Sequence, residues 1–130
     1  METVDWLKQW GCSRSFGLGT RLPWDPQYLI ESLSDSTIYM AYYTIAHHLQ
    51  KDMEGREQGG LSITADLLDD AAFDHIFLNR DAVDHAIPRE KLDLMRKEFQ
   101  YWYPMDLRCS GKDLIKNHLT MSLFNHQAVF

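Results

Sequence analysis

Apolar and polar residues recur along this chain with the periods of helices and strands, and these periods divide the sequence into segments. In several stretches the apolar residues return every three to four positions, as on the buried face of a helix. These stretches predict helices at residues 3–10, 36–50, 71–78, 89–101 and 113–130. Short apolar runs predict strands at residues 12–16, 28–33 and 107–109. A charged connector that contains three glycines spans about residues 51–62, and we expect it to be a surface loop that tolerates change.

The order of these elements favours an α/β fold. Strands alternate with helices, which is typical of layered domains whose strands pair in parallel. Three strands are too few to close such a sheet, so strands such as 29–33 and 107–109 should have neighbours on both sides. The apolar helical patterns also continue to both ends of the 130 residues. We therefore expect one domain or less, and a fragment of a larger protein.

Two clusters of polar residues resemble metal ligands in composition but not in spacing. His47 and His48 are adjacent, so on an ideal helix they would lie on different faces, and we predict solvated or rim residues rather than a shared metal site. Four aspartates lie between residues 66 and 74 without the spacing of a calcium loop. We interpret them as a solvated helix face in which Asp69 or Asp70 caps the helix at 71–78.

Composition excludes several classes of function. The formal net charge of -6 argues against a free-standing DNA-binding domain, which needs clustered cations. The sequence has only two cysteines, Cys12 and Cys109, and neither has a second cysteine within metal-ligand spacing, so we expect no zinc site, no disulfide framework and a reducing, cytoplasmic setting. No apolar run approaches the length of about 18 residues that spans a bilayer, and we expect no membrane partner.

Candidate chemistry gathers at two predicted junctions between a strand and a helix. In the first, Gly111 and Asp113 open the last helix and His118 follows about one and a half turns later. In the second, Ser36 and Tyr39 are neighbours in a first helical turn. A carboxylate at such a junction can hold a ribose or an amine at the edge of a sheet. It can equally be an ordinary helix cap, and both interpretations remain open from the residues alone.

The stretches that contain these junctions closely resemble leucyl-tRNA synthetases of the archaeal and eukaryotic cytosolic type. They are residues 10–20 (WGCSRSFGLGT), 33–39 (LSDSTIY) and 109–114 (CSGKDL), and a longer match runs from Leu22 to Thr44. The resemblance implies the second half of a class I catalytic domain of Rossmann type, with parallel strands and covering helices, beginning just after the inserted editing domain. Such an enzyme activates leucine with ATP and transfers it to tRNA(Leu).

The resemblance also implies roles for individual residues, none of them catalytic. Gly111, Lys112 and Asp113 would bind the ribose of the nucleotide. The pocket for the leucine side chain would be formed by Leu33, Ser36, Tyr39 and His118. Arg14 would lie near the 3′ end of the tRNA. ATP would enter as a substrate, accompanied in the full-length enzyme by Mg²⁺, and no metal ligand is implied within these residues.

The same resemblance implies that important parts of the enzyme are not in this sequence. Neither the His-rich signature nor the Lys-Met-Ser-Lys-Ser loop, which bind the ATP phosphates in this family, occurs in the 130 residues. Because class I activation depends on positioning and charge stabilisation at those phosphates, we expect the chain to be inactive by itself. The alternative is a non-catalytic nucleotide-binding or protein-interaction module derived from the synthetase.

Overall fold

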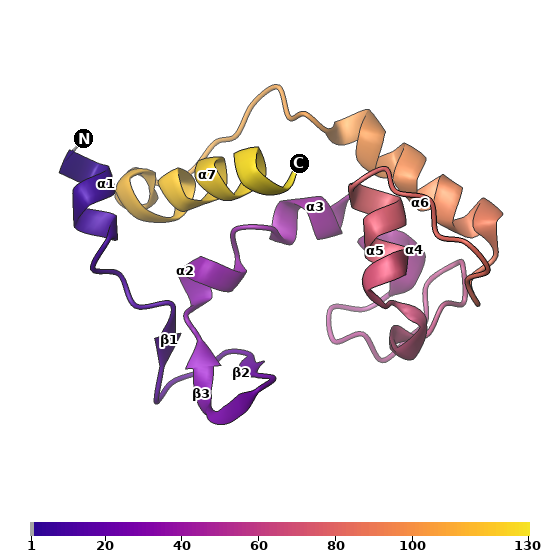
Figure 1. The fold of residues 1–130 in the computed structure, drawn as a ribbon, viewed down its shortest axis with the longest axis horizontal. Coiled ribbons are helices and arrows are strands. Elements are labelled where there is room, and N and C mark those ends of the chain that lie inside the picture. The colour runs from indigo at the N-terminus through magenta and orange to yellow at the C-terminus, as the bar shows by residue number, and fades with distance from the viewer. Residues whose placement is uncertain (1) are drawn as a thin grey trace. The chain divides into compact units, whose positions relative to one another are not determined.

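The structure, a computed structural model, describes residues 2–130 and has an α/β composition (Figure 1). The chain forms two compact units. The first, here called the sheet unit, contains the residues up to Tyr39 together with Arg108–Val129. The second, the helical unit, contains Met40–Leu107 and Phe130. No helix of the described residues has both the length and the apolar character needed to cross a membrane.

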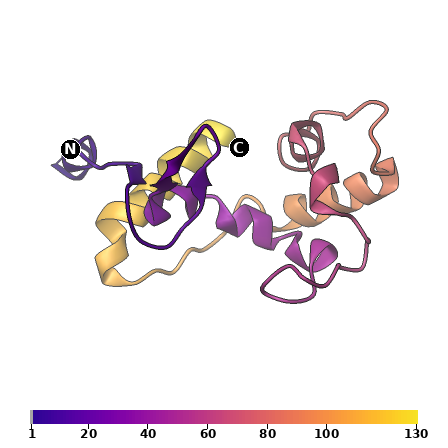
Figure 2. The ribbon, with the colours of Figure 1, turned by 90° about the horizontal axis from the view of Figure 1, so that it is seen from below.

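The sheet unit contains three short strands, β1 (Ser13–Arg14), β2 (Arg21–Leu22) and β3 (Asp25–Ile30). Their order is β1-β3-β2, so β3 has a neighbour on each side (Figures 1 and 2). Both pairings are antiparallel, with Ser13 opposite Ile30 and Arg21 opposite Leu29. The predicted parallel pairing is therefore wrong for β1 and β3, and β2 lies in a stretch where no strand was predicted.

Two of the predicted strands also differ from the structure in position. The strand predicted at 28–33 is β3, which ends at Ile30 because Glu31 caps the next helix. The Glu31 carboxylate accepts a hydrogen bond from the backbone N–H of Leu33, over 2.8 Å, and so competes with continued strand geometry. Residues 107–109 have no regular secondary structure.

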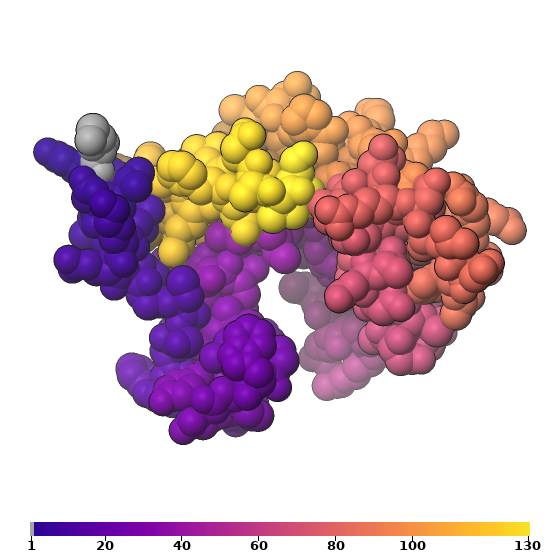
Figure 3. Space-filling view, viewed as in Figure 1, coloured from indigo at the N-terminus to yellow at the C-terminus, as the bar shows by residue number. Residues whose placement is uncertain are grey.

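The helices of the sheet unit are short or irregular. They are α1 (Glu2–Leu7), α2 (Ser32–Asp35), the 3₁₀ turn η2 (Lys112–Leu114), the π-helix η3 (Ile115–Leu119) and α7 (Thr120–Val129). In place of the continuous helix predicted from residue 113, the chain forms a 3₁₀ turn, then a π-helix and then an α-helix. η3 packs against α1, α2 and α7. α7 lies at the surface in Figure 3, with the side chains of Leu123 and Phe124 66% and 62% exposed.

The helical unit has a well-formed apolar core between two helices. Its elements are α3 (Tyr39–Tyr43, which begins at the unit's border), α4 (Ala46–Leu49), the 3₁₀ turn η1 (Ala65–Leu67), α5 (Asp70–Phe77) and α6 (Arg89–Trp102). α5 packs on α6. Their buried faces join residues from α4 and the loops, and the core consists of Ile45, Leu49, Ile63, Ala72, Ile76, Ile87, Leu92 and Met95. The helix predicted at residues 89–101 is confirmed as α6, and its Leu92, Met95 and Phe99 are buried.

One predicted helix, at residues 36–50, is broken into separate pieces. α2 ends at Asp35, and α3 and α4 cover the rest with two interruptions. A threonine marks each interruption: the Thr37 hydroxyl donates to the carbonyl of Ser34 over 2.9 Å, and the Thr44 hydroxyl donates to that of Ala41 over 2.7 Å. Such bonds from a side chain to the preceding turn compete with a continuous helix.

The connector at 51–62 is held more tightly than its composition predicted. Gln50 and Gln58 form an antiparallel bridge, and the N–H of Gly59 donates to the carbonyl of Leu49 over 2.8 Å. A Cβ atom at Gly59 would lie only 2.3 Å from the carbonyl oxygen of His48. The prediction of a tolerant loop is therefore wrong at Gly59, where only glycine fits without backbone movement.

The histidines of the helical unit lie in positions that their spacing in the sequence did not predict. The His47 and His48 rings lie side by side, with centroids 3.9 Å apart, so the prediction of different faces is wrong. Burial lowers the pKa of His48, and the adjacent His47 lowers it further, while Glu98 raises it. His75 is fully buried: its Nδ1 accepts the N–H of Ala82 over 3.1 Å, and its Nε2 lies 2.8 Å from Asp93.

Asp69 caps α5, as one of the two predicted alternatives. Its carboxylate accepts the N–H of Ala72 over 2.9 Å and lies 3.0 Å from Nε2 of His85. The hydrogen bond from Ala72, followed by that from His85, lowers the pKa of Asp69. The aspartates of this segment thus include a structural cap as well as solvated side chains.

Candidate functional site

The sheet unit brings the two predicted junctions together. Ser36 follows α2, Tyr39 begins α3, and His118 lies in η3, some 80 residues further along the chain. η3 packs against α2, which also carries Leu33. Residues 111–113 directly precede η3, and η2 packs on it. The residues named for the ribose and for the leucine pocket therefore lie on neighbouring elements of one compact unit.

His118 is the central side chain of this arrangement. It is 4% exposed, and its Nε2 lies 3.1 Å from the carbonyl oxygen of Ser36. Because a carbonyl only accepts, Nε2 carries a proton and donates it to this hydrogen bond. Nδ1 is buried and has no hydrogen-bond partner among the described residues. The Tyr39 ring stacks on the imidazole, with centroids 6.1 Å apart and planes inclined by 27°.

Arg108 is a member of the site that the sequence did not reveal. Its guanidinium donates a short hydrogen bond to the hydroxyl of Tyr39 and lies over the same ring, with Cζ 5.5 Å from the centroid. Such a cation over a ring fixes the orientation of the tyrosine. The only available signal was that Arg108 lies in the stretch before Gly111, and this does not distinguish it from a surface arginine.

The turn at residues 111–113 presents an exposed carboxylate. Gly111 has extended backbone, and a Cβ atom there would lie 3.1 Å from Oδ1 of Asp113, so glycine allows the carboxylate to fold back over the turn. Lys112 and Asp113 are exposed. An exposed carboxylate accepts hydrogen bonds from paired hydroxyls such as those of a ribose. The angle of an ideal helix between Asp113 and His118 does not apply here, because a 3₁₀ turn and a π-helix separate them.

Arg14, on β1, is tied into the sheet unit by Glu31. Its Nη2 donates to the hydroxyl of Ser32 over 2.7 Å and lies 3.2 Å from a carboxylate oxygen of Glu31. Glu31 also caps α2 and accepts from the Trp10 indole over 3.3 Å. The guanidinium thus has a structural role, and its half-buried position leaves part of it accessible.

Comparison with known proteins shows which enzymes are similar to this chain in sequence. No protein-family model matches the chain. The cytoplasmic leucine–tRNA ligase of Neurospora crassa is 58% identical over 132 residues, which cover 98% of this chain and 12% of that protein. The cytoplasmic enzyme of Saccharomyces cerevisiae is 56% identical over 128 residues, covering 98% of the chain and 12% of that protein. The leucine–tRNA ligase of Pyrococcus horikoshii is 52% identical over 135 residues, covering 98% and 13%.

These matches agree with the resemblance found from the residues alone. They extend over nearly the whole chain, and the chain spans about 12% of the length of the Neurospora and Saccharomyces relatives. Identity above one half over such a length reflects common descent rather than shared composition. The chain is therefore similar, over nearly its whole length, to one segment of the cytoplasmic and archaeal leucine–tRNA ligases.

Proposed function

We propose that this chain supplies part of the catalytic domain of a leucine–tRNA ligase. The observation that carries the proposal is the identity of 52–58% to such ligases over 98% of the chain. The full enzyme would join the carboxylate of leucine to the α-phosphate of ATP, with release of pyrophosphate. It would then transfer the leucyl group to the 3′ end of tRNA(Leu) and release AMP. Relatives named cytoplasmic support the same compartment for this chain.

In this proposal the sheet unit binds the nucleoside and the amino acid. Asp113 accepts the ribose hydroxyls, helped by the close approach that Gly111 allows and by the neighbouring Lys112. Leu33, Ser36, Tyr39 and His118 line the pocket for the leucine side chain. The contacts of His118 with Ser36 and Tyr39 support this grouping, since they fix one wall of the pocket. Arg14 lies near the tRNA 3′ end.

The phosphates of ATP and their Mg²⁺ would be bound by residues of the full enzyme that this sequence does not contain. The strands of the surrounding parallel Rossmann sheet would likewise come from the rest of the catalytic domain. The chain by itself then holds substrates without activating them. Its contribution to the rate is the positioning of two reactants.

A segment exchange tests the proposal. The matching segment of the Saccharomyces cerevisiae ligase is replaced by this chain, and leucine-dependent exchange of pyrophosphate into ATP is measured. We expect the chimera to be active, because 56% of the residues are already shared. A chimera that folds with the melting temperature of the parent but shows no exchange would overturn the proposal. The isolated chain should show no exchange. An inactive chimera, together with heat on titration of the isolated chain with a leucyl-adenylate analogue, would favour a binding module instead.

A substitution in the active chimera tests the ribose assignment. Asp113→Ala should lower kcat/KM for ATP about 10- to 150-fold, because a hydrogen bond to a charged group contributes about 1.5–3 kcal/mol. Asp106→Ala is the matched control, since it removes another exposed carboxylate seven residues earlier. Unchanged ATP kinetics in Asp113→Ala, or an equal loss in the control, would show that the assignment is wrong.

A further inference from the structure

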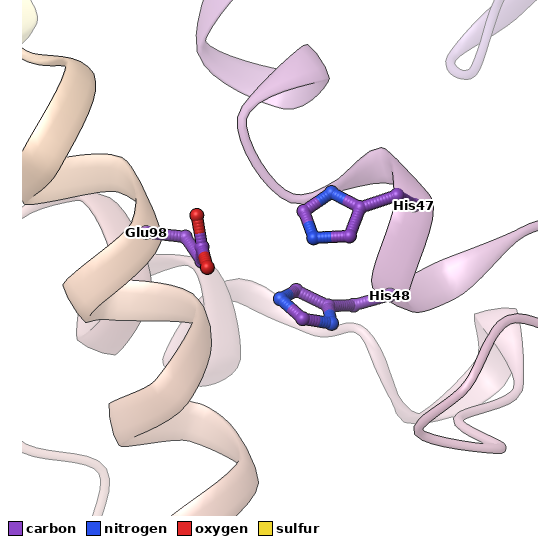
Figure 4. A group of neighbouring side chains, drawn as sticks. All are labelled: His47, His48 and Glu98. Carbon is purple, nitrogen blue, oxygen red and sulfur yellow. The ribbon is translucent and has the colours of Figure 1, made fainter.

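A second group of potential ligands lies in the helical unit, away from the residues assigned above. His47 and His48 project from α4 toward Glu98 on α6 (Figure 4). One nitrogen of each imidazole and one oxygen of the carboxylate lie within 4.8 Å of one another. α4 is only four residues long, and the rings of its two adjacent histidines lie together, with centroids 3.9 Å apart.

One atom of this group lacks a partner. Nε2 of His48 is buried and makes no hydrogen bond to any described residue. Buried polar atoms in folded proteins nearly always have a partner, and an unpaired one calls for a bound water or ion. The nearest candidates to share such a partner are the His47 ring, which is exposed, and the Glu98 carboxylate, which is partly exposed.

We propose that His47, His48 and Glu98 form a binding site for a divalent transition-metal ion of the Zn²⁺ class. Two imidazole nitrogens and one carboxylate oxygen are a ligand set that Zn²⁺ accepts, with a fourth position left for water or another ligand. This set is too rich in nitrogen for Ca²⁺ or Mg²⁺, which prefer oxygen. The inference is independent of the proposed ligase function, since it uses only residues of the helical unit.

The geometry requires a small closure of the side chains. Ligand atoms about 2.1 Å from a tetrahedral Zn²⁺ lie about 3.4 Å from each other, against the 4.8 Å that bounds this group. The exposed His47 and the long Glu98 side chain can make this movement by rotation. The backbone under His48 is fixed, because the N–H of Leu61 donates to its carbonyl over 3.2 Å and Gly59 packs on the same carbonyl.

The open position would face a groove in the helical unit. His47 and Glu98 belong to the wall of a groove of about 900 Å³ that also includes Tyr43 and Trp102. The exposed fractions of these two aromatic side chains are 65% and 57%. A metal ion there is reached directly from solvent, so loading needs no opening of the core.

Titration with metal tests the site. The chain is prepared metal-free with Cys12→Ser and Cys109→Ser, because both thiols are exposed and would bind Zn²⁺ themselves. We expect one equivalent of Zn²⁺ to bind in calorimetry, and Co²⁺ to give the visible absorption of a four-coordinate site. His48→Ala and His47→Ala should each weaken binding by about 100-fold or more, since even indirect supports of metal ligands contribute about 10- to 100-fold.

Two further variants make the result decisive. Glu98→Gln keeps the size of a partly exposed side chain and should weaken Zn²⁺ binding at least about tenfold without unfolding the chain. His126→Ala, on α7 in the sheet unit, is the matched control and should leave binding unchanged. The absence of Zn²⁺ heat and of Co²⁺ absorption in the parent would overturn the proposal. Full-strength binding by His48→Ala or Glu98→Gln would overturn it as well.

Discussion

Two adjacent glycines should respond in opposite ways to the same added methyl group. In Gly59→Ala the new Cβ would lie 2.3 Å from the carbonyl oxygen of His48 and 2.6 Å from the N atom of Leu49, both of them backbone atoms. A Cβ contact is ordinary beyond 3.4 Å, so the connector must move by about 1 Å. In Gly60→Ala the Cβ meets nothing within 4 Å.

The size of the effect follows from what that movement breaks. Two backbone hydrogen bonds, from Gly59 to Leu49 and from Leu61 to His48, would be lost or lengthened. At about 0.5–1.5 kcal/mol each they contribute about 1–3 kcal/mol, and residual overlap adds about 1 kcal/mol. We therefore expect Gly59→Ala to lower the free energy of unfolding by about 2–4 kcal/mol. Gly60→Ala should change it by less than about 1 kcal/mol, in either direction.

Urea unfolding followed by circular dichroism measures both variants against the parent. The midpoint should fall for Gly59→Ala with an unchanged slope, since the same surface is exposed on unfolding. If the parent is already close to its unfolding midpoint, Gly59→Ala should be unfolded without urea while Gly60→Ala remains folded. Equal midpoints for the two variants would refute the close approach of Gly59 to α4.

Two further predictions concern polar groups of the helical unit. His75→Phe keeps a ring in the core but leaves the N–H of Ala82 without its acceptor. We expect the free energy of unfolding, measured in urea, to fall by about 1–3 kcal/mol. An unchanged urea midpoint would contradict the buried hydrogen bond. The lowered pKa of Asp69 contributes stability that is present above the unfolded pKa of about 3.9 and is lost as the pH falls through the folded pKa. Asp69→Asn keeps a capping oxygen but cannot titrate, so its urea midpoint should fall less steeply than that of the parent below about pH 4, and parallel curves would exclude this role.

Sequence predicted best the elements whose apolar period is long and regular. α5 and α6 lie within a few residues of the predicted ranges, and Asp69 was one of the two residues named as the cap of α5. In these helices the burial of one apolar face determines the structure, and the spacing of apolar residues in the sequence shows which face that is. A few local polar groups do not change which face is buried.

Prediction failed where a local hydrogen bond or a distant neighbour decides the conformation. The hydroxyls of Thr37 and Thr44 interrupt a stripe that reads as one helix of 15 residues, from 36 to 50. Residues 107–109 have the composition of a strand, but a strand needs a hydrogen-bonding neighbour, and none of the described residues provides one beside them.

The candidate site shows the same division. Resemblance named Ser36, Tyr39 and His118, and the fold brings these three into contact. Arg108 was missed because its partner Tyr39 is 69 positions away in the sequence. The pairing of His47 with His48 was missed because the angle between adjacent residues on a helix was taken to separate their side chains, whereas the two rings come together.

The hydrogen bond from His118 to Ser36 has a consequence for the timescale on which the sheet unit opens. His118 is only 4% exposed, the Tyr39 ring stacks on the imidazole, and the Nε2 proton is donated to the carbonyl oxygen of Ser36. It can exchange with solvent only when η3 separates from α2, so its exchange rate counts openings of that contact rather than motions of exposed loops. A single imidazole proton, followed by magnetic resonance in water, would therefore report how often the sheet unit opens at this contact.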